Sequence, residues 1–281
     1  MPPSSSRRPH ARRTASTIAI LTDFGYRDHY VGAMRGVIAS IAPDAQVIDL
    51  THGIPAQQVI AGAIALRESW RYFPRRTIFL AVVDPGVGTE RLPIAIETRA
   101  GARFVGPDNG LLSLAANETG PWRAVKLTAA RYRLKEVSAT FHGRDIFAPA
   151  AAWLARATEV DKLGPPLAKI HELQLPQVVQ AGRVLRGEIL YVDGFGNLVT
   201  NIDRARLTLF KACFPADQLF VRIKGGAPMR ILDAYGDASV GDSLATLGSF
   251  GMLEIAVRDG SAAARFAAGP GAPLTVGVGR R

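Results

Sequence analysis

The chain has 281 residues, of which 48% are hydrophobic and 21% charged, and this composition excludes wholesale disorder, collagen-like repeats and a coiled coil. The length suits two domains of roughly 100 to 200 residues each. The longest nearly uncharged apolar stretch, Ile146 to Ala155, is about half of the roughly 20 residues that a membrane span needs, so we expect no transmembrane helix. The formal net charge of +10 raises the question of nucleic acid binding.

Much of this positive charge lies near the ends of the chain. Several arginines fall within residues 1–16, and the chain closes on Arg280 and Arg281. Residues 1–16 lack the apolar centre of a secretory signal, so we interpret them as a disordered basic leader and expect any nucleic acid binding to be incidental. Cys213, the single cysteine, cannot form an intrachain disulfide, which suits a reducing, cytoplasmic location. Its apolar neighbours predict a buried, inert thiol.

From residue 17 to residue 163, short apolar runs alternate with longer amphipathic ones, the pattern of βα units. We therefore expect an α/β N-terminal domain with a mainly parallel sheet, in which Asp28 caps the first helix. The expected strands are Thr17 to Leu21, Ala45 to Leu50, Thr77 to Val83, Leu92 to Glu97 and Arg103 to Val105, and the expected helices run from Asp28 to Pro43, from Ala56 to Trp70 and from Ala148 to Ala157.

A change in composition divides the chain after this region. Residues 164–183 are rich in proline and show little periodicity, which predicts a linker. Residues 184–281 then carry short strand-like runs separated by Gly, Asp and Asn turns, so we expect a smaller all-β C-terminal domain, a sandwich or a barrel. Its expected strands are Val184 to Val192, Val199 to Ile202, Leu219 to Ile223, Ser243 to Leu247 and Leu253 to Val257.

Common catalytic motifs such as GxxxxGK[ST], HExxH and GxSxG are absent from the sequence, so the chemistry must be sought in isolated polar residues. Asp23 directly follows the first predicted strand and Asp84 follows the third. In open parallel sheets, ligands bind outside the carboxyl ends of the strands, and Pro85 keeps Asp84 out of the helical region. The alternative is that both aspartates only cap turns.

Two further residues can join these carboxylates. Arg91 lies seven residues after Asp84, close enough to fold back and form an ion pair with it. His142 comes from the segment TFHGRDIF, ahead of the Ala-rich helix. Taken alone, His142 is more often a structural histidine, and His29 and His52 have an equal claim. The spacing does not choose among the three histidines.

The predicted C-terminal domain contains two polar turns. The segment DGFGNLVTNI sets Phe195 between Asp193 and Asn197, an arrangement that can stack a flat ring and offer an amide to its edge. The alternative, which the residues alone favour, is a hairpin turn, because Asp, Gly and Asn are the residues that tight turns require. Ser249 lies in a second turn, GSFG, and can bind a carboxylate or an amine.

Six segments together resemble a known family. LTDFGYRDHYVGAMRGVI, VVDPGVGTER, GPDNGLL, TFHGRDIFAPAAA, DGFGNLVTNI and GSFGMLEIA occur in the order typical of the S-adenosyl-L-methionine (SAM) hydrolases, also called SAM hydroxide adenosyltransferases, which are relatives of SAM-dependent fluorinases and chlorinases. The resemblance implies a reaction of SAM with water that yields adenosine and L-methionine, without a metal or another cofactor. It also implies a homotrimer whose active site lies between the N-terminal domain of one subunit and the C-terminal domain of its neighbour.

The resemblance also implies the roles of individual residues. Asp84, Arg91 and His142 match the catalytic triad of the hydrolases. The matched substrate-binding positions are Asp23 at the ribose hydroxyls, Asn197 at the adenine edge, Asp193 and Ser249 at the methionine end, Asp28 and Phe195 in the pocket wall, Gly143 where halogenases contact the halide, and Glu254 with the backbone near Val257.

The chain departs from the halogenases in two places and leaves three alternatives open. Phe250 stands where halogenases have an arginine, and the turn from Asp193 to Asn197 is one residue shorter. The first alternative is a SAM-dependent halogenase, against which Asp84 and His142 argue because fluorinase-type members carry other residues there. The second is a non-catalytic, regulatory protein that binds SAM or adenosine. The third is a metal-dependent phosphoesterase built on Asp23, Asp84 and His142.

Overall fold

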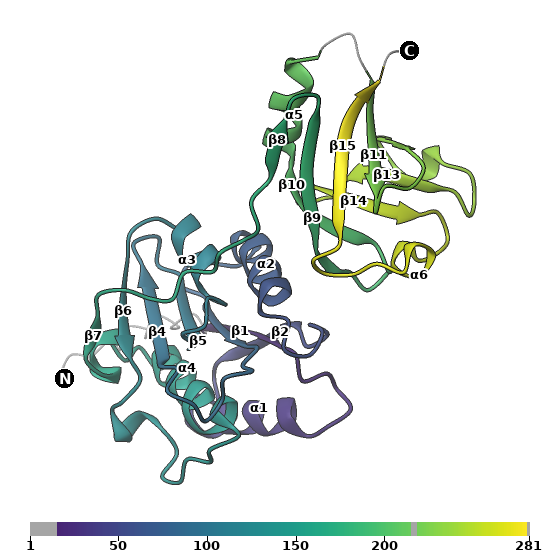
Figure 1. The fold of residues 1–281 in the computed structure, drawn as a ribbon. Coiled ribbons are helices and arrows are strands. Elements are labelled where there is room, and N and C mark those ends of the chain that lie inside the picture. The colour runs from purple at the N-terminus through teal and green to yellow at the C-terminus, as the bar shows by residue number, and fades with distance from the viewer. Residues whose placement is uncertain (1–15, 215–217, 280–281) are drawn as a thin grey trace, which may run out of the picture. The chain divides into compact units, whose positions relative to one another are not determined.

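A computed structural model describes residues 16–214 and 218–279 of the chain. By its internal contacts the chain divides into two compact units, the first ending at Leu173 and the second beginning at Gln174. Each unit is built on one large β-sheet (Figure 1). The basic leader predicted for residues 1–16 falls, except for Ser16, outside the described residues. The predicted limits of the domains at residues 163 and 184 stay a prediction, and short strands β7 (Pro166–Leu167) and β8 (Val179–Ala181) lie within the expected linker.

The first unit holds a seven-stranded sheet in the order β2-β1-β3-β5-β4-β6-β7. Strand β1 pairs in parallel with β2 and β3, and β3 pairs in parallel with β5, whereas β4 is antiparallel to both β5 and β6 and β6 is antiparallel to β7. The remaining bounds are β1 (Thr17–Thr22), β2 (Gln46–Thr51), β3 (Ile78–Val82), β4 (Pro93–Thr98), β5 (Arg103–Pro107) and β6 (Trp122–Lys126).

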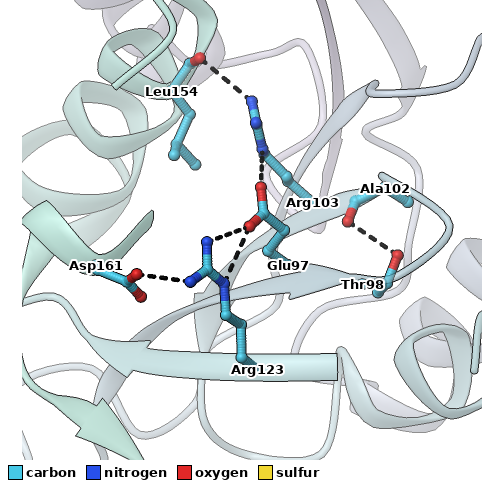
Figure 2. A network of polar contacts seen from close by, with 7 residues as sticks. All are labelled: Glu97, Thr98, Ala102, Arg103, Arg123, Leu154 and Asp161. Carbon is cyan, nitrogen blue, oxygen red and sulfur yellow. Dashed lines mark hydrogen bonds and ion pairs between the residues drawn. The ribbon is translucent and has the colours of Figure 1, made fainter. Parts of the chain in front are cut away.

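The expected mainly parallel sheet is therefore wrong, because the sheet is mixed. Strands β4 and β5 are joined by a tight turn closed by hydrogen bonds between Thr98 and Ala102, and so short a connection allows only an antiparallel pair. Strand β6 and the edge strand β7 then continue the antiparallel half of the sheet. A network of ion pairs links these strands (Figure 2): Glu97 accepts from Arg103 at 2.9 Å and from Arg123 at 2.6 Å, and Arg123 also binds Asp161 at 2.6 Å.

Helices cover both faces of this sheet because its buried strands are apolar on both sides. Ile18 and Ile20 face a core shared with α1 (Tyr30–Ile41) and α4 (Ala148–Ala155), while Leu21 faces Gly62 of α2 (Val59–Ser69). Asp28 does not cap α1 as predicted, since the N-cap residue is His29 and no side chain caps the helix. Helix α3 (Ser113–Glu118) and the π-helical turn Gly143–Phe147 are elements that the sequence patterns did not predict.

The second unit holds an eight-stranded antiparallel sheet in the order β12-β11-β15-β9-β10-β14-β13, with β8 beside β9. A bridge between Ile231 and Ala245 brings the two ends of this order together, so the sheet is nearly closed like a barrel. The bounds are β9 (Val184–Val192), β10 (Leu198–Asp203), β11 (Gln218–Ile223), β12 (Met229–Arg230), β13 (Ser243–Leu247), β14 (Met252–Val257) and β15 (Pro273–Gly279).

The expected all-β composition of this unit is also corrected by the structure. Helix α5 (Arg204–Ala212) follows β10 directly, capped by the Asp203 carboxylate, and α6 (Ala262–Phe266) precedes β15. Cys213, predicted to be buried, is exposed at the end of α5. In the part of the chain that the structure describes, no helix is long and apolar enough to traverse a bilayer.

Candidate active site

Asp84 lies just beyond the end of β3, in a turn that returns the chain to Arg91. Gly88 has a φ of +78°, and a Cβ there would lie 2.6 Å from the carbonyl oxygen of Ala139. This turn therefore needs glycine both for its backbone conformation and for its close approach to the segment that precedes His142. The local sequence thereby brings residues from two distant parts of the chain into contact.

Arg91 contacts both other members of the predicted triad. Its Nε donates to Oδ1 of Asp84 at 2.8 Å, and its Nη2 donates to Oδ2 of the same carboxylate. Nη2 also lies 2.9 Å from Nδ1 of His142. The side chains of Arg91 and Asp84 are only 9% and 5% exposed, and Nη1 of Arg91 is buried without a hydrogen-bond partner among the described residues. The guanidinium also lies over the ring of Phe147.

His142 lies at the N-terminus of the π-helical turn. An arginine can only donate hydrogen bonds, so Nδ1 of His142 must accept from Arg91, and the neutral ring carries its proton on Nε2. Burial, and next the positive charge of Arg91, lower the pKa of His142 below its ordinary value. The imidazole is therefore neutral at pH 7, with one nitrogen committed to Arg91 and an N–H to donate at the other.

Asp23 directly follows β1, at the same sheet edge as Asp84. Its Oδ2 accepts a hydrogen bond of 2.8 Å from the backbone N–H of Gln57. Burial raises the pKa of the Asp23 carboxyl, the bond from Gln57 opposes this shift, and the negative charge of Asp84 adds to it. The two carboxylates thus lie close enough for one to influence the ionisation of the other.

Gly143 packs among apolar groups beside His142. A Cβ at this position would lie 3.2 Å from the sulfur of Met34, 3.3 Å from the ring of Phe141 and 3.5 Å from that of Phe24. The rings of Phe24 and Phe141 meet edge to face, with their centroids 6.0 Å apart. Asp28 lies exposed in the loop before α1, and no contact draws it toward this cluster in the part of the chain described.

In the second unit, Asp193 organises the turn between β9 and β10. Its Oδ1 accepts from the backbone N–H groups of Phe195 and Asn197, at 2.9 and 2.8 Å, and its Oδ2 accepts from Nδ2 of Asn197 at 2.9 Å. The segment is thus a hairpin turn, as the residues alone favoured, and it leaves Phe195 83% exposed. The structure therefore brings Asp193 and Asn197 together and presents an aromatic ring to solvent beside them.

Glu254 lies on β14 beneath the turn that carries Ser249. A Cβ at Gly248 would lie 2.7 Å from Oε2 of Glu254, so only glycine leaves room for the carboxyl. Burial raises the pKa of Glu254, the hydrogen bond from Tyr235 opposes the shift, and the charge of Asp193 adds to it. Val257, at the end of β14, is buried. Glu254 and Asp193 thus lie in the same region of this unit.

Sequence reasoning missed two groups at these places. The backbone N–H of Gln57 donates to Asp23, and Gln57 has a left-handed backbone with a φ of +65°. A pattern of side chains does not predict a backbone donor. Tyr235 donates to Oε1 of Glu254, but it begins a short 3-10 helix, Tyr235–Asp237, whose contact with β14 no local pattern predicts. Among the described residues no group of three or more His, Cys, Asp or Glu side chains could hold a metal ion.

Two family models match the chain, one for each unit. Residues 18–164 match the SAM hydroxide adenosyltransferase N-terminal domain and residues 187–275 match its C-terminal domain. The chain belongs to the SAM hydroxide adenosyltransferase family. The predicted resemblance is thereby confirmed, and Asp84, Arg91 and His142 all fall within the N-terminal match.

The relatives of this chain include named enzymes. A protein of Thermus thermophilus named (R)-S-adenosyl-L-methionine hydrolase is 39% identical over 264 residues, which cover 92% of this chain and 98% of the relative. A fluorinase of Nocardia brasiliensis is 27% identical over 93% of this chain and 97% of its own length. Among solved structures, an uncharacterized conserved protein from Thermotoga maritima matches with a TM-score of 0.83 and 36% identity, covering 92% of this chain and 99% of that one.

Proposed function

We propose that this protein hydrolyses S-adenosyl-L-methionine to adenosine and L-methionine, through attack of water on the ribose C5′ atom. The observation that carries the proposal is the buried contact of Arg91 with both Asp84 and His142 in a chain whose relatives are named (R)-S-adenosyl-L-methionine hydrolase. The alternative as a SAM-dependent halogenase has less support, since the fluorinase is the less similar relative.

The three polar residues suit the activation of water. Water has a pKa of about 15.7, so positive charge and hydrogen-bond donors must stabilise a hydroxide-like nucleophile. Arg91 offers the buried Nη1 donors that lack a partner among the described residues, and His142 offers Nε2–H. Arg91 has no lone pair and Nδ1 of His142 is engaged, so we assign the Asp84 carboxylate as the group that receives the proton from water.

The reaction removes charge, and an apolar site favours such a change. The nucleophile attacks C5′ in line with the sulfonium, the C5′–S bond breaks, and methionine leaves as a neutral thioether that needs no general acid. Attack of a hydroxide-like oxygen on a sulfonium removes charge, and an environment poor in water favours that change. Phe24 and Phe141, packed around Gly143, are positioned to exclude water. Alignment of the reacting atoms at roughly 3 to 3.5 Å supplies much of the acceleration.

The remaining residues have proposed roles in substrate binding. The Asp23 carboxylate binds the ribose hydroxyls, since carboxylate oxygens accept hydrogen bonds from a diol. Nδ2 of Asn197 donates to Asp193, which leaves its Oδ1 to accept from the adenine amino group. The other proposed contacts are Asp193, Ser249 and Glu254 at the methionine end, Asp28, Phe195 and the backbone of Val257 in the pocket wall, and Gly143 beside the attacking water.

We also propose a cytoplasmic homotrimer that needs no metal, with each active site shared by the N-terminal unit of one subunit and the C-terminal unit of the next. The presence of ligand-binding candidates in both units supports this arrangement, because the residues proposed for the ribose belong to the first unit and those proposed for adenine and methionine belong to the second.

The direct test of the proposed function is product analysis. Purified protein incubated with SAM should release adenosine and methionine in equal amounts, and Asp84→Asn should abolish this release while the variant still binds adenosine. Release by Asp84→Asn at the wild-type rate would contradict the role of the carboxylate. SAM that binds but stays intact would favour a regulatory protein instead.

A further inference from the structure

A buried histidine outside the proposed triad contacts Thr22, the residue before Asp23. His52 follows β2, and its side chain is 0% exposed. Its Nδ1 lies 2.7 Å from Oγ1 of Thr22, the last residue of β1, and its Nε2 lies 3.3 Å from Oδ1 of Asp49. The ring of Tyr26 meets that of His52 edge to face at 4.9 Å.

The hydrogen bond between Thr22 and His52 has a defined donor and acceptor. Thr22 Oγ1 accepts from the backbone N–H of Phe24 at 3.2 Å, so its hydroxyl proton is available to Nδ1 of His52. Nε2 of His52 then carries the ring proton toward Oδ1 of Asp49, although at 3.3 Å neither of these buried atoms makes a hydrogen bond among the described residues. The other oxygen of Asp49 accepts from Arg35 at 2.6 Å and from Tyr26 at 3.1 Å, which keeps the carboxylate in place.

The contacts of His52 and its loop reach the residues on both sides of Asp23. Thr22 precedes Asp23 and the N–H of Phe24 follows it, and the backbone N–H of Gly25 donates to the carbonyl oxygen of His52 at 2.8 Å. Asp23 itself is reached from the same loop by the N–H of Gln57. The loop after β2 therefore fixes the backbone on each side of Asp23 and one oxygen of its carboxylate.

We propose that His52 is a positioning residue, which acts through the Thr22 hydroxyl to hold the Asp23 carboxylate in the orientation that binds the ribose hydroxyls. The inference rests on the proposed function, since it takes the ribose as the partner of Asp23. A nucleophilic role for Thr22, which the order Asp49, His52, Thr22 would suggest, is excluded by burial, because Thr22 is 0% exposed.

The test compares two nucleosides that differ only in the ribose hydroxyls. Calorimetry measures the affinities of adenosine and of 2′,3′-dideoxyadenosine for wild type, Thr22→Val and Thr22→Ser. Thr22→Val removes the hydroxyl at nearly constant volume, and we expect it to raise the Kd of adenosine about five- to tenfold while the Kd of dideoxyadenosine stays unchanged. Thr22→Ser, which keeps the hydroxyl, should restore most of the adenosine affinity.

Matched variants distinguish the loss of positioning from a general loss of structure. Thr98→Val removes another buried threonine hydroxyl, which binds the Ala102 carbonyl, and it should change neither affinity. His52→Asn keeps an acceptor close to the place of Nδ1, so it should weaken adenosine binding less than His52→Leu. In an Asp23→Ala background, Thr22→Val should add no further loss, because both changes remove the same contact.

Two outcomes would overturn the inference. They differ in whether only the role of His52 is wrong or also the proposed role of Asp23. If wild type prefers adenosine but Thr22→Val keeps that preference, or weakens both nucleosides equally, His52 and Thr22 do not act through Asp23. If wild type binds the two nucleosides equally, the ribose role of Asp23 itself is wrong and the positioning role falls with it.

Discussion

At the scale of single residues, Arg91 makes different contacts with its two partners: it binds a carboxylate in Asp84 and a ring nitrogen in His142. It holds both oxygens of Asp84 and the Nδ1 atom of His142, which leaves its own Nη1 and the Nε2–H of His142 as donors. These hydrogen bonds hold the Arg91 guanidinium in one orientation. Preorganised donors of this kind stabilise charge that develops in a transition state.

The first prediction concerns turnover without these donors. Arg91→Ala and His142→Ala should each lower kcat about 10²- to 10⁴-fold, while calorimetry finds adenosine affinity within about twofold of wild type. His29→Ala, which changes an exposed histidine at the start of α1, is the matched control and should keep wild-type turnover. Unchanged kcat in both triad variants would remove Arg91 and His142 from the mechanism.

The second prediction concerns pH. The pKa of His142 is lowered by burial and by Arg91, so the neutral ring that accepts from Arg91 persists below the ordinary histidine pKa of about 6.5. Protonation would set a second positive charge against Arg91 and break this contact. A profile of kcat/KM against pH should therefore lose activity only below about pH 6.5, and the residual activity of His142→Gln should lack that limb. A limb centred above pH 7 would contradict the assignment.

The candidate residues differ in how far the sequence could identify them. Asp84 and Arg91 were predictable as a pair because a short turn connects them, and the structure forms that pair. His142 could be chosen over His29 and His52 only through the family resemblance, since its contact with Arg91 depends on packing between distant segments. The Gln57 N–H could not be predicted, because it is a backbone group placed by a single left-handed residue.

At the scale of elements, the network around Glu97 ties the antiparallel half of the first sheet together (Figure 2). Burial alone would raise the pKa of Glu97, but the hydrogen bonds from Arg123 and Arg103 lower it below its ordinary value. Glu97 lies on β4, Arg103 on β5 and Arg123 on β6. One carboxylate thus crosslinks three neighbouring strands.

The third prediction is a pH-dependent loss of stability in Glu97→Gln. The lowered pKa means that the ionised carboxylate stabilises the folded state above its unfolded pKa of about 4.3 and that this contribution is lost as the pH falls through the folded value. Urea unfolding at pH 7 should find Glu97→Gln less stable by about 1 kcal/mol, with the difference shrinking below about pH 4. Glu136→Gln, at an exposed glutamate, is the control. A difference that is constant across this range would contradict the ionic origin.

The elements that the sequence predicted best are those with a strong pattern. The strands β1, β2 and β3 fall within a residue or two of their predicted ends. For β1 and β3 the reason is that continuous apolar runs mark strands buried on both faces. The direction of strand pairing was wrong for the sheet beyond β5, since the residues of a strand do not specify which neighbour it joins. The π-helical turn was missed because its five residues are too few to show a helical period in the sequence.

At the scale of the whole molecule, candidate ligand groups are divided between two units. The triad and Asp23 belong to the first unit, and Asp193, Asn197 and Glu254 belong to the second. In a closed trimer with head-to-tail contacts, each first unit would meet the second unit of a neighbouring subunit. Two differently damaged subunits could then rebuild an intact site between them.

The fourth prediction tests this arrangement by mixing subunits. Asp84→Asn and Asn197→Ala homotrimers should each be nearly inactive, but co-refolded equal mixtures should regain about a quarter of wild-type activity, because that fraction of junctions in a random cyclic trimer joins two intact units. Wild type refolded with Asp84→Asn is the reference for subunit exchange. Mixtures no more active than their components would contradict a shared site, and a monomeric mass in light scattering would exclude the trimer.

The measurement that tests the central claim most directly follows the oxygen of water into the product. Chelator-treated protein is incubated with SAM in chloride buffer made with ¹⁸O-labelled water, and the nucleoside is identified by mass spectrometry. We expect adenosine with one labelled oxygen at the 5′ position, in an amount equal to the methionine released, and we expect the rate to survive chelation. A 5′-chloronucleoside would move the protein to the halogenases, and unlabelled adenosine would contradict attack of water at C5′.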